Sequence, residues 1–511
     1  MKILLAALGC LALTLSGTAI AQGPPPASEI VPTVEGVPEP YRQITRHELK
    51  TKNGEIEYAA IAADTHIYDL AGNVTGSIFS FTYLRTDVQD PNRPVLFVFN
   101  GGPGAASIWI HMGAIGPRQV VLDADVNPSS VPPFEIRDNP ASVLDVADIV
   151  FIDPIGTGYS RTLNGTKPNA FWGVDEDANS IAQFMELWLS EYGRWNSPKF
   201  VLGESYGTVR AAVLPRALTG GPLYGGVMRG ITLDGIIMLG TTIGKMGRAP
   251  DFTPEELAAT LARQLPGQAV TSRYHGITTG PQSIPELFEE TLAYAKGPYL
   301  EALLKLQQET LTDAEKADVL AQLSAYTGVP ETAYSEDLHL DDGAYVKRVL
   351  GASGMELGKY DSRYSLPLAQ SGNDPVADDP AMALYTPGFV ASFHQMLRED
   401  LEVAISRPYL SIRWQDLNFS WNYRRQGPIQ GETYAHELAW AMRRNPDLNL
   451  MVASGYYDLV TTPAEAKAQV AAAALPEDRV TFKEYESGHM LYLGGTSEAF
   501  ADDLRAFLLK D

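Results

Sequence analysis

Ser205 lies at the centre of the motif Gly-Glu-Ser-Tyr-Gly, which occupies residues 203–207. An apolar run at residues 200–202 precedes the motif and a helix-compatible stretch follows it, so the pattern predicts a strand, a sharp turn and a helix. Such a turn exposes the serine in a strained conformation, and the flanking glycines remove Cβ atoms that would collide with the neighbouring strand and helix. The motif predicts a nucleophilic serine, but by itself it also fits an ordinary structural turn.

A nucleophilic serine needs a base and an acid that orients the base, and in this kind of turn they follow in the order Ser, Asp, His. Asp458 follows a predicted strand at residues 448–453, and His489 follows another at residues 480–485. Both lie just past the C-terminal ends of strands, the edge where α/β folds collect their sites. We therefore predict Ser205 as nucleophile, His489 as general base and acid, and Asp458 as the residue that orients the imidazole.

The glycine-rich sequence Asn-Gly-Gly-Pro-Gly at residues 100–104 follows a further predicted strand, at residues 94–99. It lacks the Lys-Ser/Thr ending of a phosphate loop and the spacing of a dinucleotide-binding motif. Glycines let a backbone approach a reacting carbonyl and direct N–H groups at it, as an oxyanion hole requires. We predict that Gly102 supplies one donor and the N–H of Tyr206 the other.

The elements that position these residues are apolar strands alternating with amphipathic helices. Further strands are predicted at residues 147–152 and 235–239, and a helix at residues 179–192. Residues 47–86 instead alternate apolar and polar side chains around a turn signal, which predicts antiparallel hairpins. The predicted fold is an α/β sheet with an antiparallel start.

Between residues 241 and 434 the strand pattern stops and helix signals dominate. Thr253 starts a helix with proline at its first position, and residues 312–315 form a capping box. Further helical patterns cover residues 285–296 and 387–401. A helical insertion at this point is well placed to act as a cap over the site, and it also fits a segment that only adds stability.

The first residues have the pattern of an export signal. Lys2 precedes an apolar run at residues 3–15, and residues 19–21, Ala-Ile-Ala, form a small-x-small cleavage signal. The run is shorter than a membrane-spanning helix requires, and no later stretch reaches that length. Cys10 is the only cysteine and lies in this leader. We expect a mature protein without disulfides that is exported, either periplasmic or secreted.

The chain therefore divides into five predicted segments. They are a signal peptide at residues 1–21, a proline-rich linker at 22–42, a first core part at 43–240, a helical insertion or cap at 241–434 and a second core part at 435–511.

The net charge and the missing motifs argue against nucleic acid, anionic membranes and zinc as partners. A formal net charge of −23 argues against nucleic acid or an anionic membrane as the main partner. The pairs His47-Glu48 and His436-Glu437 both lack the second histidine of a His-Glu-x-x-His zinc motif. We expect no metal and no cofactor, and the sequence predicts no oligomeric state.

Five motifs, in order between about residues 94 and 494, together resemble the serine carboxypeptidase family in its bacterial form. They are Asn-Gly-Gly-Pro-Gly at 100–104, Asp-Pro-Ile-Gly-Thr-Gly-Tyr-Ser at 153–160, Gly-Glu-Ser-Tyr-Gly at 203–207, Gly-Tyr-Tyr-Asp at 455–458 and Gly-His-Met at 488–490. The resemblance implies an α/β-hydrolase fold with a mostly parallel central sheet. It also implies a serine-type carboxypeptidase that removes C-terminal residues from peptides through an acyl-enzyme on Ser205.

The resemblance further implies that Asn100, Gly101 and Glu204 hold the free α-carboxylate of the peptide. A glutamate can donate a hydrogen bond to a carboxylate only when it is protonated. Burial beside the nucleophile and the negative charge of the substrate would both raise the pKa of Glu204.

The chain departs from the family pattern at Ala114, where many members have a second glutamate, and at Ala105, where a cysteine is usual. The first departure leaves the specificity open, because a protonated pair of glutamates is not available in that form. An esterase, an acyltransferase or an aminopeptidase could use the same triad, and a non-catalytic binding protein is a third alternative.

Overall fold

The computed structural model of the chain describes residues 36–122, 126, 128–245, 252–334, 337–426, 431 and 433–509. The predicted signal peptide lies outside the described residues, as does the predicted linker up to residue 35.

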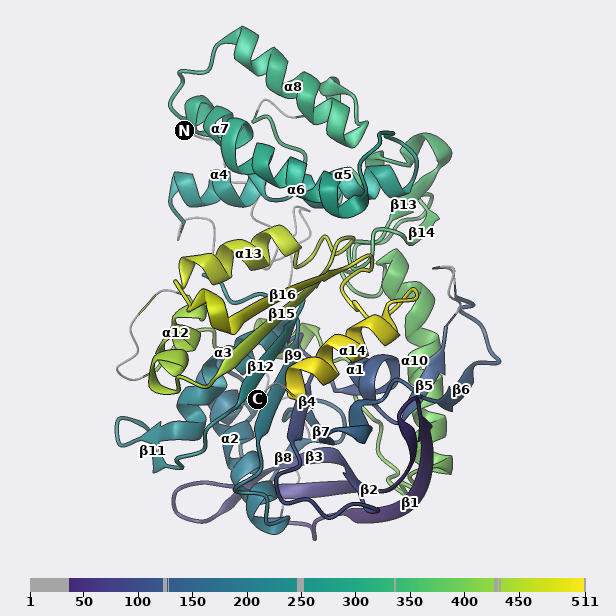
Figure 1. Cartoon of the computed structure of the whole chain (residues 1–511), viewed down its shortest axis with the longest axis vertical. Helices are drawn as coiled ribbons and strands as arrows, with labels where there is room; N and C mark the ends of the chain where they lie inside the picture. Colours follow the sequence, from purple (N-terminus) through teal and green to yellow (C-terminus); the bar gives the residue numbers. More distant parts are fainter. Residues whose placement is uncertain are drawn as a thin grey trace.

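A ten-stranded mixed sheet forms the centre of the molecule (Figure 1). From edge to edge its strands are β1 (Arg42–Thr51), β2 (Gly54–Tyr68), β3 (Val74–Arg85), β7 (Asp148–Asp153), β4 (Val95–Phe99), β9 (Lys199–Glu204), β12 (Gly235–Leu239), β15 (Asn449–Gly455) and β16 (Val480–Tyr485), and β8 (Arg161–Thr162) pairs with β3. The six strands from β7 to β16 in this order pair in parallel, whereas β1, β2 and β3 are antiparallel. The predicted α/β-hydrolase class, a mostly parallel sheet with antiparallel N-terminal hairpins, is confirmed.

The central strands are buried on both faces because helices cover both. Along β4, Val95, Phe97 and Phe99 belong to the hydrophobic core on one face, and Leu96 and Val98 to the core on the other. The first core is covered by α2 (Val174–Glu191), α3 (Tyr206–Thr219), α12 (Ala435–Arg444) and α13 (Pro463–Ala472). The second is covered by α1 (Ile108–Ile110), the π-helix at His111–Ile115, α10 (Pro380–Glu399) and α14 (Ser497–Leu508). The apolar runs that predicted buried strands reflect this double cover.

Helices dominate the chain between β12 and β15, and α4 to α8 lie at one end of the molecule beyond α13 in Figure 1. In addition to α10 and α12, the α-helices of this segment are α4 (Pro254–Ala262), α5 (Leu265–Tyr274), α6 (Ile284–Tyr294), α7 (Leu300–Gln307), α8 (Asp313–Thr327), α9 (Asp342–Arg348) and the short α11 (Gln415–Phe419). Full capping boxes start α4 at Thr253 and α8 at Thr312, so both predicted helix starts are confirmed.

The segment between β12 and β15 differs from its predicted pattern in two ways. It contains a short antiparallel hairpin, β13 (Met355–Leu357) with β14 (Ser365–Pro367), whose strands are too short to give a period-two signal. Its last long helix, α10, packs against the face of the sheet instead of forming part of a cap. The ring centroids of Phe393 in α10 and Phe81 in β3 are 5.6 Å apart. Part of the predicted insertion therefore belongs to the main core.

Two short strand pairs lie outside the main sheet. They are β5 (Arg118–Val121) with β6 (Glu135–Asp138) and β10 (Gly220–Gly221) with β11 (Tyr224–Met228).

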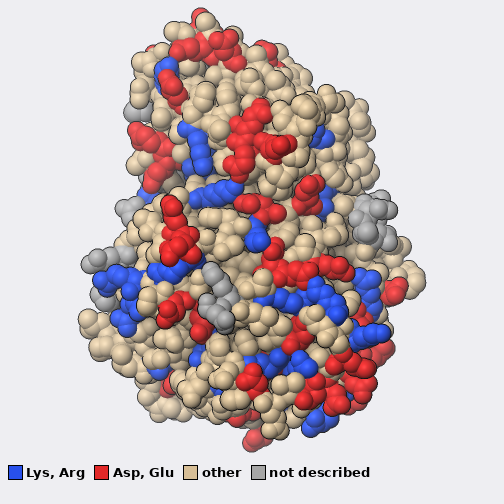
Figure 2. Space-filling model, in the orientation of Figure 1, with Lys and Arg blue, Asp and Glu red and all other residues tan. Residues whose placement is uncertain are grey.

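On the face shown in Figure 2, acidic and basic side chains are interspersed. Within the described ranges, no helix has the length and apolar composition that a membrane span requires.

Candidate active site

Ser205 occupies the sharp turn between β9 and α3. Its backbone has φ +59° and ψ −128°, a region that residues with a side chain rarely adopt. A Cβ on Gly203 would lie 2.1 Å from the carbonyl oxygen of Gly207, so glycine is required where the strand and helix come together. The Ser205 N–H donates to the Leu239 carbonyl of β12 at 2.8 Å. The predicted strand, strained turn and helix are all present.

His489 and Asp458 lie side by side in the loops that follow β16 and β15. Both are buried, and Nδ1 of His489 is 2.8 Å from Oδ2 of Asp458. The other oxygen, Oδ1, accepts the N–H groups of Val460 and Thr461 at 2.7 and 2.9 Å. A carboxylate fixed in this way keeps the proton on Nδ1, which leaves Nε2 free to accept one.

The groups around His489 act on the pKa of its imidazole in opposite directions. Burial opposes the imidazolium, but the carboxylates of Asp458 and Glu204 outweigh burial and raise the pKa of His489 above its usual value. An imidazole in this setting can take a proton from a nearby hydroxyl and stabilise the charge that results.

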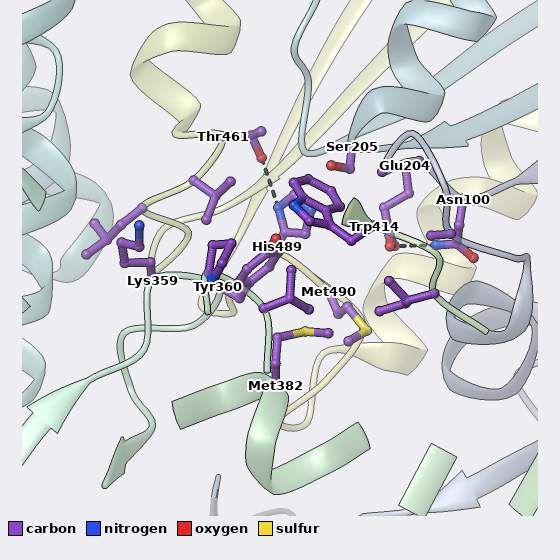
Figure 3. Close-up of a pocket in the computed structure, with 18 of the residues that line it drawn as sticks. Asn100, Glu204, Ser205, Lys359, Tyr360, Met382, Trp414, Thr461, His489 and Met490 are labelled. Atoms are coloured by element: carbon purple, nitrogen blue, oxygen red, sulfur yellow. Dashed lines mark hydrogen bonds between the residues drawn. The ribbon is translucent and has the colours of Figure 1, made fainter. Parts of the chain in front are cut away.

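Ser205 and His489 line one cavity of about 370 Å³ (Figure 3). Among the described residues no hydrogen bond joins the two side chains, and such contacts commonly tighten only when substrate binds. The predicted Asn100, Gly101, Gly102 and Glu204 line the same cavity. Asp458 does not line the cavity, but it is hydrogen-bonded to His489, which does.

The glycine-rich loop lies against the start of α3. A Cβ on Gly101 would be 2.4 Å from the Tyr206 nitrogen, and Gly102 has φ +103°. The buried Arg210 holds the loop, since it donates to the Asn100 carbonyl at 2.7 Å and pairs with Asp177 at 2.5 Å. The loop backbone and the Tyr206 N–H are therefore neighbours, as an oxyanion hole formed by Gly102 and Tyr206 requires.

Glu204 is a buried carboxyl at the end of β9, directly before Ser205. The Asn100 amide donates to its Oε1 at 2.7 Å, as the dashed line in Figure 3 marks. Burial raises the pKa of Glu204 to about 7, against the opposing effects of His489, Tyr492 and Asn100. A substantial fraction of this carboxyl is neutral near pH 7 and able to donate a hydrogen bond.

The sequence pattern did not reveal two groups of residues at this site. Thr461 donates to Oδ2 of Asp458 at 2.5 Å and lies 3.0 Å from Nδ1 of His489; its position three residues after Asp458 was the available signal. The insertion contributes Asp342 and Lys359 to the cavity. Burial raises the pKa of Asp342 to about 7, and Lys359 opposes the rise. No local pattern marks either residue, because only the tertiary fold brings them to Ser205.

The segment between β12 and β15 also holds the two loops that carry Asp458 and His489. The Leu459 N–H, next to Asp458, donates to the Lys359 carbonyl at 2.9 Å, and the His489 N–H donates to the Tyr360 carbonyl at 2.6 Å. Among the described residues, no group of three or more His, Cys, Asp or Glu side chains could hold a metal ion.

A family model described as serine carboxypeptidase matches residues 70–222. The resemblance to the serine carboxypeptidase family is confirmed. The matched segment carries the Asn100 loop, Glu204 and Ser205, whereas Asp458 and His489 lie outside it.

Curated serine carboxypeptidases match a similar share of the chain. Serine carboxypeptidase-like 5 of Arabidopsis thaliana is 31% identical over 132 residues, which is 25% of this chain and 28% of the relative. Serine carboxypeptidase ctsa-3.2 of Caenorhabditis elegans is 31% identical over 146 residues, which is 28% of this chain and 26% of the relative. The match thus spans little more than a quarter of the length of these relatives.

Two solved structures match most of the length of this chain at low TM-scores. A peroxisomal alpha-beta-hydrolase, Lpx1, from Saccharomyces cerevisiae has a TM-score of 0.33 and 8% identity, covering 92% of this chain and 90% of that chain. A lipase in its open form has a TM-score of 0.35 and 14% identity, covering 91% and 98%. Scores this low carry no argument about function, and the fold assignment rests on the strand order.

Proposed function

We propose that this protein is a serine hydrolase that removes C-terminal residues from peptides. The observation that carries this proposal is Glu204, a buried carboxyl next to Ser205 with a pKa raised to about 7. While neutral it can donate a hydrogen bond to the α-carboxylate of a peptide, beside the Asn100 amide. The match of residues 70–222 to the serine carboxypeptidase model supports the same function.

In the proposed reaction, the Ser205 hydroxyl attacks the last peptide carbonyl while His489 takes its proton at Nε2. The N–H groups of Gly102 and Tyr206 stabilise the oxyanion, and each such donor is worth about 3 kcal/mol. His489 then gives the proton to the departing amine, which leaves an acyl-enzyme on Ser205. Water, activated by the same imidazole, releases the shortened peptide. Asp458 keeps the imidazole oriented and stabilises its positive charge.

The cap role of the insertion is part of the proposal. Lys359 and Tyr360 line the cavity and bind both triad loops through their carbonyls. We expect the insertion to limit how much of a peptide fits, in addition to stabilising the loops. Export through residues 1–21 is likewise proposed, and fractionation of cells that produce the full chain tests it.

One observation favours an aminopeptidase as the second candidate. Asp342 lines the cavity and is 2% exposed, and its Oδ2 has no hydrogen-bond partner among the described residues. When ionised, this carboxylate would attract the free α-ammonium of a peptide. In that case the requirement would be a free N-terminus rather than a free C-terminus.

A substrate panel separates these functions. It compares N-blocked dipeptides with free and with amidated C-termini, unblocked peptides, and simple acyl esters. The carboxypeptidase proposal predicts the highest kcat/KM for N-blocked peptides with a free C-terminus. Preference for unblocked peptides would indicate an aminopeptidase, and preference for esters would indicate an esterase. A protein that does not react with a fluorophosphonate probe would be non-catalytic.

A further inference from the structure

Tyr492 is a buried tyrosine three residues after His489, and it is 1% exposed. Its ring packs on Gly113, where a Cβ would lie 2.5 Å from the Tyr492 Cε2 atom. The next residue is Ala114, at the point where the family resemblance leads one to expect a second glutamate. A tyrosine from a distant segment thus packs beside two small residues.

The Tyr492 hydroxyl lies close to the Glu204 carboxyl, and each group affects the other. Burial, followed by Glu204, raises the pKa of Tyr492 well above its usual value, so the hydroxyl stays neutral. In return Tyr492 opposes the rise in the pKa of Glu204. Among the described residues, neither the Tyr492 hydroxyl nor Oε2 of Glu204 has a hydrogen-bond partner. Oε1 is taken by Asn100, so Oε2 and the hydroxyl are available to each other.

We propose that Tyr492 is a positioning residue for binding of the substrate carboxylate, in that its hydroxyl holds the Glu204 carboxyl in place and donates to its ionised form. This inference rests on the proposed function of Glu204. A second glutamate would share a proton with Glu204 and push one of the two pKa values up. A tyrosine acts in the opposite sense, because a donor to the charged form favours that form.

The other groups that act on Glu204 are known and do not change in the test. His489 lowers and Asp458 raises the pKa of Glu204, each from its own loop, and the Asn100 amide lowers it. Substitutions confined to position 492 leave all three in place. A difference between such variants and the wild type therefore reports on the Tyr492 hydroxyl.

The experiment compares pH profiles of kcat/KM for a matched pair of peptides, one with a free and one with an amidated C-terminus. Tyr492→Phe removes one donor to the ionised carboxyl. The fall of kcat/KM on the alkaline side, for the peptide with a free C-terminus, should therefore shift to higher pH by about one unit. Site-specific replacement of Tyr492 by 3-fluorotyrosine makes the hydroxyl a stronger donor and should move the fall down. The profile for the amidated peptide should not move in either variant.

The matched control is Tyr299→Phe, which removes another buried hydroxyl, one that donates to the Leu338 carbonyl at 2.8 Å in the insertion. It should leave both profiles unchanged. If Tyr492→Phe fails to fold, the fluorotyrosine variant still decides, since it keeps the ring and the hydroxyl. Unmoved profiles for the free C-terminus, or equal shifts for both peptides, would overturn the inference. A wild type without preference for the free C-terminus would overturn the proposed function together with it.

Discussion

The His489 N–H donates to the carbonyl of Tyr360 at 2.6 Å, so a residue of the insertion holds the loop of the proposed catalytic base. Tyr360 is itself fixed by Asp379, whose Oδ2 accepts the N–H groups of Lys359 and Tyr360 at 2.6 and 3.4 Å. Hydrogen bonds thus connect Asp379 to Tyr360 and Tyr360 to His489, so the insertion supports the structure of the site.

Asp379→Asn should weaken this support. The asparagine amide cannot accept the N–H groups of both Lys359 and Tyr360 and also cap α10 as the carboxyl does. We expect a loss of about 1–3 kcal/mol in the free energy of unfolding, together with a lower kcat. Thermal unfolding and steady-state kinetics measure the two effects. A variant with wild-type kcat would show that the support does not matter for the chemistry. Asp374→Asn, at an exposed carboxyl of the same segment, is the control.

Thr461→Val should change the acid–base behaviour of His489. It removes the hydroxyl that donates to Oδ2 of Asp458 at 2.5 Å but keeps the shape of the side chain. Without this donor the carboxylate attracts the imidazolium more strongly, so the pKa of His489 rises and the acidic limb of kcat moves to higher pH. A fall in kcat of about tenfold is expected. Thr461→Ser, which keeps the hydroxyl, should restore both values, and an unchanged acidic limb in Thr461→Val would contradict the account.

Ser205→Ala and His489→Ala test the proposed triad as a unit. Each should lower kcat by about 10⁵–10⁶-fold while the fold is retained, because members of a triad act together. Labelling by a fluorophosphonate probe should vanish in Ser205→Ala. Undiminished labelling of that variant would place the nucleophile elsewhere, and a circular dichroism spectrum matching the wild type excludes misfolding.

The sequence could predict those parts of the site that depend on local pattern. The turn at Ser205 shows in its flanking glycines, and the places of Asp458 and His489 follow from apolar strands that end just before them. The central strands were predictable because helices bury both of their faces. Their order in the sheet was not, because strand order depends on contacts between distant segments.

The residues that the sequence did not reveal are those that reach the site only through tertiary contacts. Asp342 and Tyr360 come from the insertion, which matches no motif of the family. Tyr492 lies close to His489 in sequence, yet its place beside Glu204 depends on packing against Gly113, about 380 residues earlier. For the same reason the packing of α10 on the sheet was missed, since its helical period does not say which surface it covers.

Glu204→Gln tests whether a neutral Glu204 binds the substrate carboxylate. Glu204 is neutral below its pKa of about 7, so the wild type should bind a free C-terminus best at mildly acidic pH and lose this ability as Glu204 ionises and repels the substrate carboxylate. Glutamine keeps a donor that cannot ionise. Its kcat/KM for a peptide with a free C-terminus should not fall on the alkaline side, while hydrolysis of the amidated peptide changes little.

The decisive measurement is therefore kcat/KM against pH for the free and amidated forms of one N-blocked dipeptide, in the wild type and in Glu204→Gln. We expect a wild-type preference for the free C-terminus that disappears above about pH 7 and persists in the variant. A wild type without preference for the free C-terminus at any pH would contradict it.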